Sequence, residues 1–328
     1  MPDTHDPPGP KMLVYTVRRF LQLTPLVLGM ILIVMLLPRF VPGDAVTIML
    51  GTEAVISPER AQEMRRLLGL DRSIPQQYWD YLVALSQGDL GRSLRTGRPL
   101  GPLIADRFML TANIALLSLV MAVVFGVPLG VLGARYRGTR WSVFLQTFNL
   151  IGLSFPTFWI GTILLIGATF YFQGIFPTLG SAGPDAPWFQ HLRYAFLPSV
   201  TLAIPVTAVL ARITQSSMIE ALAQDYVKVA RSKGLSERVV FYKHALRNSL
   251  IPVVTELGLQ AGLILGGVVT IELVFSYPGI GLLVLNAINQ RDYPILQSVL
   301  LIVSALFFVI NYLVDISYAW LNPMIVYE

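Results

Sequence analysis

The amino-acid sequence predicts an all-α integral membrane protein with six transmembrane helices. Of its 328 residues, 54% are hydrophobic and only 13% are charged, whereas soluble domains carry about 25% charged residues. The apolar residues also gather in uninterrupted runs that are long enough to cross a hydrocarbon core. A water-soluble fold could not bury so much apolar surface, and we therefore expect the chain to lie in a lipid bilayer.

The predicted spans begin close to the N-terminus. Residues 1–17 form a polar tail, and the 19 uncharged residues between Arg19 and Arg39 place the first span at 18–38. This run is longer than the apolar part of a signal peptide, and no small-residue cleavage site follows it. Five more spans are predicted, at 108–134, 143–172, 194–211, 252–274 and 295–318.

The distribution of basic residues predicts the orientation. If the N-terminus is cytoplasmic, 13 of the 24 lysines and arginines lie in inside segments and 2 lie in short outside loops. The remaining 9 lie in the long segment 39–107, and loops of that length are largely exempt from the positive-inside rule. Both termini and the loop 212–251 are therefore predicted to be cytoplasmic.

Segment 39–107 is predicted to form a small extracytoplasmic helical cap. Ser57 and Pro58 are typical of a helix start, and Gly69 is typical of its end. A second helix is predicted between Pro75 and Gly88 on the same grounds.

The most informative stretch is an island of charge between two apolar runs, from Glu220 to Pro252. Residues 225–233 are predicted to form a short helix, which Gly234 closes in the left-handed conformation that suits glycine. Ser236 can then cap a second helix. Basic cytoplasmic loops are common in membrane proteins, so composition alone leaves the role of this stretch open.

The residue pattern of this stretch resembles the permeases of ABC importers for dipeptides, oligopeptides and nickel. Ala230-x-x-x-Gly234 followed by His244-Ala-Leu-Arg-Asn248 is similar to their cytoplasmic "EAA" loop, although Lys228-Val-Ala230 stands where Glu-Ala-Ala gives that loop its name. The resemblance runs from about residue 13 to the C-terminus, where Asn322-Pro-Met-Ile-Val-Tyr327 replaces a frequent Asp-Pro-Arg-Ile-Arg-Tyr. Further matching motifs are Pro42-Gly-Asp44, Gly88-Asp-Leu-Gly91, Asp225-Tyr-Val227, Val274-Phe-Ser-Tyr-Pro-Gly-Ile-Gly281 and Arg291-Asp-Tyr-Pro294.

This resemblance implies a type I ABC importer permease fold in a bacterial cytoplasmic (inner) membrane, with 108–328 as the permease domain. It also implies the partners: a second, C-type permease, two P-loop ATPase subunits and an extracytoplasmic solute-binding protein that delivers di- or oligopeptides. Residues 220–252 would couple the permease to the ATPases. The implied coupling residues are Asp225, Tyr226, Val229, Ala230, Lys233, Gly234, Leu235, Ser236, His244 and Arg247.

No catalytic, cofactor or metal site is predicted on this chain. None of its four lysines follows a glycine in the Gly-Lys-Ser/Thr order of a P-loop, so ATP and Mg²⁺ are assigned to the ATPase subunits. The three histidines, at 5, 191 and 244, lie too far apart in the predicted topology to share a metal ion, and there is no cysteine. The net charge of +5 follows from membrane topology and predicts no nucleic-acid partner.

Acidic residues and glycines inside the spans are the remaining candidates. Glu256, Glu272 and Asp315 would each cost about 2.5–3.5 kcal/mol at the bilayer centre. They either lie at the level of the lipid headgroups, or Glu256 or Glu272 faces the translocation path and attracts a peptide amino terminus. Glycines four apart allow close helix packing, within this subunit or against the second permease; they are Gly258, Gly262 and Gly266.

Other functions stay open at this stage. The cargo could be nickel, glutathione or an oligosaccharide, because the binding protein usually selects it. An ion-driven secondary transporter would need carboxylates near the membrane midplane and usually has duplicated halves, but the sequence shows no internal repeat. An intramembrane enzyme would need a nucleophile and a base at membrane depth, and no histidine accompanies the serines and threonines of the spans.

Overall fold

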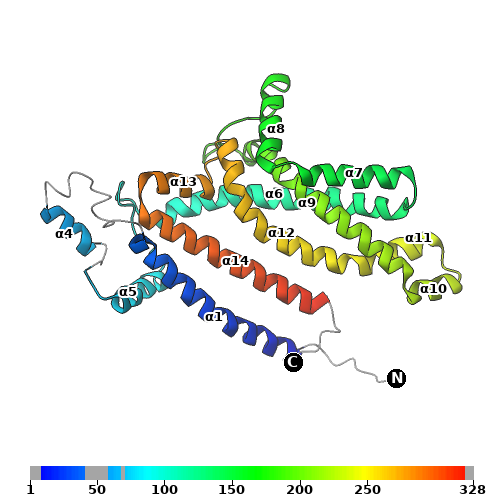
Figure 1. Cartoon of the computed structure of the whole chain (residues 1–328), viewed down its shortest axis with the longest axis horizontal. Helices are drawn as coiled ribbons and strands as arrows, with labels where there is room; N and C mark the ends of the chain where they lie inside the picture. Colours follow the sequence, from blue (N-terminus) through cyan, green and yellow to red (C-terminus); the bar gives the residue numbers. More distant parts are fainter. Residues whose placement is uncertain (1–8, 41–57, 68–70, 322–328) are drawn as a thin grey trace. The chain divides into compact units, whose positions relative to one another are not determined.

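The computed structural model describes residues 9–40, 58–67 and 71–321, which divide into two compact units. One unit is centred on 109–282, and the other combines 16–108 with 283–308. Among the described residues, helices are joined by turns and loops, and the β pairing is limited to one isolated bridge between Arg92 and Pro99, which confirms the predicted all-α class. The helices in Figure 1 are α1 Gly9–Phe40, α4 Pro58–Leu67, α5 Ile74–Ser86, α6 Leu100–Arg135, α7 Arg140–Ser154, α8 Thr157–Tyr171, α9 Trp188–Ala223, α10 Asp225–Ser232, α11 Glu237–Val239, the π-helix η1 Val240–Ala245, α12 Leu246–Val274, α13 Ile280–Gln290 and α14 Tyr293–Leu321.

Each of the six predicted spans falls on helix. Among the described residues, α6, α9 and α14 are each long and apolar enough to cross a bilayer, and two bent pairs of helical segments are long enough when taken together, which gives up to five spans. The pairs are α7 with α8, and 237–264 with 266–274. At the first predicted span, α1 contains the shorter apolar stretch Leu21–Leu36. Length alone therefore does not give six spans. α1 begins at Gly9, inside the predicted polar tail.

The third predicted span, 143–172, is not one straight helix. α7 ends at Ser154 and α8 begins at Thr157, and the two helices meet at 98° (Figure 1). Pro156 lacks a backbone N–H and disfavours helical geometry in the residue before it. Phe155 accordingly has extended dihedral angles, with φ −90° and ψ 138°. The proline therefore breaks a span that its uncharged length predicted to be continuous.

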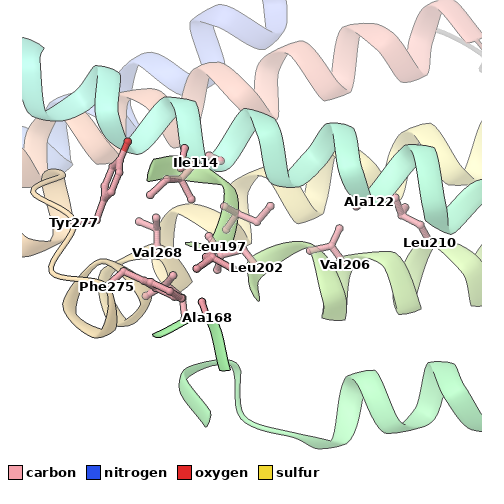
Figure 2. Packing of buried hydrophobic residues seen from close by; sticks show 14 of the residues in the cluster. Ile114, Ala122, Ala168, Leu197, Leu202, Val206, Leu210, Val268, Phe275 and Tyr277 are labelled. Atoms are coloured by element: carbon pink, nitrogen blue, oxygen red, sulfur yellow. The ribbon is translucent and has the colours of Figure 1, made fainter. Parts of the chain in front are cut away.

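The core of the first unit lies among α6, α8, α9, α12 and the turn after α12. Figure 2 shows Ile114 of α6 and Val268 of α12 close to Phe275 and Tyr277, and these four side chains are no more than 2% exposed. Lipid tails are as apolar as these side chains, so close packing rather than escape from water must hold the helices together. Other labelled members of the cluster are Ala122, Ala168, Leu197, Leu202, Val206 and Leu210.

Glycines in α6 allow that close packing. At three of them, a Cβ atom added to the glycine would come within 3.0 Å of an atom of α9, which is too close for a real side chain. The added Cβ would lie 2.9 Å from Thr207 O at Gly126, 2.5 Å from Ala211 O at Gly130, and 2.8 Å from Gln215 Cδ at Gly133. Small residues thus bring α6 against α9, as glycines do in other membrane helices.

The predicted glycine ladder of α12 packs less closely within this subunit. Gly266 is exposed, and a Cβ there would meet no atom within 4 Å. Gly258 and Gly262 are half-buried. Packing inside the subunit is therefore not the role of Gly266, and a seam with a second permease stays a prediction.

The second unit contains the two helices predicted for 39–107. α4 and α5 lie where they were expected, and Gly88 follows α5 with φ +75°. The predicted boundary residues Ser57 and Gly69 lie outside the described residues. Within this unit, Tyr78 Oη donates to Leu28 O at 2.9 Å. The turn after α5 is anchored by Ser93, whose hydroxyl donates to Asp292 Oδ2 at 2.6 Å.

Candidate functional sites: a polar hairpin and a buried carboxylate

The charged stretch between α9 and α12 begins with a helix and a glycine turn, as predicted. α10 covers Asp225–Ser232, one residue short of the expected end. Gly234 has φ +77°, its N–H donates to Arg231 O at 2.9 Å, and Leu235 N donates to Ala230 O at 3.3 Å. This pair of hydrogen bonds is the Schellman motif that closes helices at a left-handed glycine.

The second predicted helix begins at the expected residue but does not end within the loop. Ser236 has extended dihedral angles, and its carbonyl accepts hydrogen bonds from Val239 N at 2.9 Å and Val240 N at 3.0 Å. Its side chain makes no capping hydrogen bond. From Glu237 the chain stays helical through η1 into α12. The predicted loop 212–251 is therefore only a short hairpin, comprising residues 224–245, between two long helices.

A bidentate ion pair crosses the glycine turn. Arg231 Nε donates to Glu237 Oε1 at 2.8 Å, and Arg231 Nη2 donates to Glu237 Oε2 at 3.1 Å. These hydrogen bonds lower the pKa of the Glu237 carboxyl and raise the pKa of Arg231. Both side chains are exposed. This pair was not predicted from the sequence, where its only signal is two opposite charges six residues apart across a predicted turn.

The hairpin has a buried side and an exposed side. Val227, Ala230 and Val240 pack together and are 0–7% exposed. Ala230 therefore packs inside the hairpin, and its coupling role stays a prediction. The exposed side carries apolar side chains next to charged ones, as interaction surfaces do. We define the hairpin face as Tyr226, Val229 and Leu235, which are 37–53% exposed, with Asp225, Lys233 and Ser236 also exposed and His244 half-buried. Arg247, the remaining predicted coupling residue, is exposed in α12, just beyond the hairpin.

The second candidate site is Glu272, near the end of α12, which is fully buried. Its Oε1 accepts a hydrogen bond from Thr111 Oγ1 at 2.5 Å, and its Oε2 accepts one from Leu282 N at 2.9 Å. Thr111 Oγ1 in turn accepts from Ile280 N at 2.8 Å. A Cβ on Gly279 would lie 2.0 Å from Glu272 Oε1. Side chains of α6 and α12 therefore cap the first turn of α13 together.

The expectation that Glu272 or Glu256 faces the translocation path stays a prediction. In the described conformation the Glu272 carboxylate meets protein donors and no open surface. Glu256 is half-buried and accepts a hydrogen bond from Gln260 Nε2 at 2.7 Å. Asp315 lies in α14, and its side chain is outside the described part of the structure. Among the described residues, no group of three histidines or acidic residues could hold a metal ion.

Comparisons with known proteins cover nearly the whole chain. Residues 126–327 match the family "Binding-protein-dependent transport system inner membrane component", and residues 12–115 match the N-terminal family of the same membrane components. The glutathione transport system permease protein GsiC of Escherichia coli is 41% identical over 318 residues, which cover 97% of this chain and 100% of that protein. The GsiC protein of Pectobacterium atrosepticum is 40% identical over the same length.

A solved structure shares the fold. An inward-facing structure of the MetNI methionine ABC transporter matches 67% of this chain and 96% of the solved chain, with a TM-score of 0.55. Its sequence is 16% identical, so this likeness extends to the fold and not to cargo.

Proposed function

Because the chain belongs to the family of inner-membrane components of binding-protein-dependent transport systems, we propose that it moves small peptides, including the tripeptide glutathione, into the cell. The chain is the membrane permease subunit of an ABC importer, and ATP hydrolysis takes place on separate subunits. The full-length similarity to a protein named as a glutathione transport system permease carries the cargo proposal. Glutathione is itself a peptide, so one transporter could carry both the di- and oligopeptides and the glutathione that the sequence left open as cargo.

The assembly that we propose has four kinds of component. A permease of this family works with ATPase subunits, a binding protein and a second permease. For this chain we propose a C-type permease, two P-loop ATPases, and a solute-binding protein that meets the extracytoplasmic segment 39–107. Both termini and the hairpin lie in the cytoplasm in this proposal, which rests on the excess of lysine and arginine in those segments.

Coupling to ATP takes place at the hairpin in this proposal. The hairpin face offers exposed apolar side chains to an ATPase groove, and the buried Val227 and Val240 hold its two arms together. The Schellman turn and the Arg231–Glu237 ion pair favour movement of the hairpin as one body. Helical structure then continues from Glu237 to Val274. Closure of the ATPases would therefore displace α12 and switch the permease between two states by alternating access.

The test of this function is purification followed by transport. The tagged full chain is isolated from its native membrane in detergent, and the co-purifying subunits are identified and reconstituted into liposomes with the binding protein. We expect P-loop ATPases to co-purify, and ATP to drive saturable uptake of labelled di- and tripeptides and of glutathione.

Two other results would change the assignment. Uptake of nickel or an oligosaccharide without uptake of any peptide would keep the importer but reject the cargo. A complex without ATPases, whose uptake follows an ion gradient, would favour the secondary-transporter alternative. Replacing the hairpin-face residue Val229 by Asp should remove the ATPases from the complex. The control Asp185→Cys, in the exposed loop between α8 and α9, should leave them bound.

A further inference from the structure

The polar face of α7 is turned toward the protein. The buried residues of this helix are Ser142 and Asn149, both polar. Its large apolar residues Trp141, Phe144 and Phe148 are more than half exposed. Polar side chains at membrane depth usually face the helix bundle or a water-filled cavity. What Ser142 and Asn149 contact therefore indicates what this face is for.

The hydroxyl of Ser142 makes three hydrogen bonds inside the protein. It donates to Gly133 O at 3.4 Å and accepts from Gln146 Nε2 and from Gln215 Nε2, both at 3.3 Å. These contacts join α7 to α6 and α9. Ser142 therefore has a structural role, which leaves Asn149 to be explained.

Asn149 is 8% exposed, and its amide makes no hydrogen bond with any residue that the structure describes. It lies nine residues along α7 from Arg140, about 14 Å at the rise of an α-helix. Its amide atoms are not among the buried polar atoms that lack a partner in the described part of the chain, so they are open to the space beside them. That space is a cavity of about 300 Å³ between α7 and α9, which Asn149 lines.

This cavity is lined by one exposed guanidinium, several neutral polar side chains and the apolar Leu150, Leu153 and Ile219. Arg212 is the charged residue in its lining, and it forms no ion pair within the described chain. The other polar lining residues are neutral: Gln146, Asn149, Gln215 and Ser216. A guanidinium fork matches a carboxylate, with two parallel hydrogen bonds.

A second cavity, open and mainly apolar, shares Asn149 with the first and is called the apolar chamber below. Its volume is about 460 Å³, and its walls come from α6, α7, α8 and α9. Aromatic and aliphatic side chains form most of those walls, among them Phe125, Phe148 and Ile204. A ligand that reaches Asn149 would thus meet a positive charge on one side and apolar walls on the other.

We propose that these two cavities bind the C-terminal residue of the cargo peptide during its passage. Arg212 pairs with the terminal carboxylate, the Asn149 amide bonds the last peptide group, and the apolar chamber takes the terminal side chain. One guanidinium among neutral amides balances the single charge of a carboxylate, whereas a lipid phosphate is typically held by several basic residues. The inference rests on the proposed function, because it names the part of the peptide that this subunit recognises.

The test compares a tripeptide with its C-terminal amide. Uptake of both is measured in liposomes that contain the complete transporter and its binding protein. Because one charge-assisted hydrogen-bond pair is lost, we expect Arg212→Gln to lower the ratio of acid to amide uptake about tenfold, while the amide still crosses. Asn149→Asp should shift the ratio in the same direction, since its carboxylate would occupy the guanidinium. The matched control is Arg140→Gln, an exposed arginine at the start of α7 outside both cavities.

Each other outcome overturns the proposal in a recognisable way. If the wild-type complex takes up no peptide, the proposed function fails and this inference fails with it. If the wild type takes up peptides and Arg212→Gln keeps the wild-type ratio, only this inference fails. If Arg212→Gln keeps that ratio and loses a co-purifying anionic phospholipid, the cavity holds a lipid headgroup instead. Co-purification of the ATPases with the variant shows that the complex has assembled.

Discussion

At the residue scale, the buried carboxylate of Glu272 holds several segments of the chain in place. Each of its oxygens accepts a hydrogen bond, one from Thr111 and one from Leu282, and this satisfies a group that would otherwise be costly to bury. The turn that follows α12 buries Tyr277 as well, and burial together with the charge of Glu272 raises the pKa of Tyr277 to about 12. The tyrosine hydroxyl therefore stays protonated at neutral pH.

The substitution Gly279→Ala tests this arrangement. The new Cβ would lie 2.0 Å from Glu272 Oε1 and 2.4 Å from Thr111 Oγ1, so the carboxylate would have to leave its donors. Overpacking of this kind costs about 1–3 kcal/mol of folding free energy. We therefore expect the melting temperature of the detergent-solubilised complex to fall by about 2–8 °C. Gly183→Ala is the control, because a Cβ there meets no atom within 4 Å. Equal melting of the two variants would contradict the role that we assign to Glu272.

The sequence identified Glu272 as unusual but could not identify its partners. Thr111 lies 161 residues away along the chain, and no spacing rule connects two residues at that distance. Asn149 and Arg212 were likewise unremarkable in the sequence, since only the packing of α7 against α9 brings them to one cavity. Residues whose role depends on local geometry were easier to predict, as the positive φ of Gly234 shows.

At the scale of elements, the hairpin between α9 and α12 combines features that were predicted with one that was not. Its first helix and glycine turn depend on neighbouring residues and lie where the sequence placed them. A second helix after Ser236 was predicted, but its continuation into α12 was not, because this helix was expected to end inside a cytoplasmic loop before the span at 252–274. The break between α7 and α8 was also missed. A proline bends a membrane helix sharply only where other groups satisfy the freed backbone, which a single sequence does not reveal.

The substitution Gly234→Pro tests the hairpin as a coupling element. Proline fixes φ near −65° and removes the N–H, so it is incompatible with φ +77° and with the hydrogen bond to Arg231 O. We expect ATP hydrolysis by the reconstituted complex to continue while peptide uptake falls at least about tenfold, because the turn would no longer transmit the movement of the ATPases. Both rates are measured in the same liposomes. Gly138→Pro, at another glycine with positive φ (+81°), is the matched control, and normal uptake by Gly234→Pro would contradict coupling through the hairpin.

At the scale of the whole molecule, the family and the helical class followed from sequence, whereas the number of spans did not follow from helix length. The described residues hold up to five spans by length, because α1 contributes only a shorter apolar stretch. Orientation depends on the distribution of charge and needs a direct measurement. The absence of cysteine from the sequence makes that measurement clean.

Single cysteines at two exposed positions should reveal the orientation. We expect Asp185→Cys, between α8 and α9, to react with a membrane-impermeant maleimide in intact cells. Ser232→Cys, at the end of α10, should react only after the membrane is permeabilised, since it lies in the segment with the greatest excess of basic residues. The wild-type chain gives the background, which should be zero. The opposite labelling pattern would invert the proposed topology and remove the hairpin from the reach of cytoplasmic ATPases.

Beyond the bend at Pro156, α8 packs against segments that are synthesised after it. α8 buries only Gly161 and Ala168, and a Cβ on Gly161 would lie 3.2 Å from Thr201 Cγ2 and 3.3 Å from Phe275 Cε2. Both of those atoms belong to segments that leave the ribosome after α8 itself. The contacts of α8 are therefore completed only when the turn after α12 has been translated, so this part of the chain takes its final form late in biogenesis.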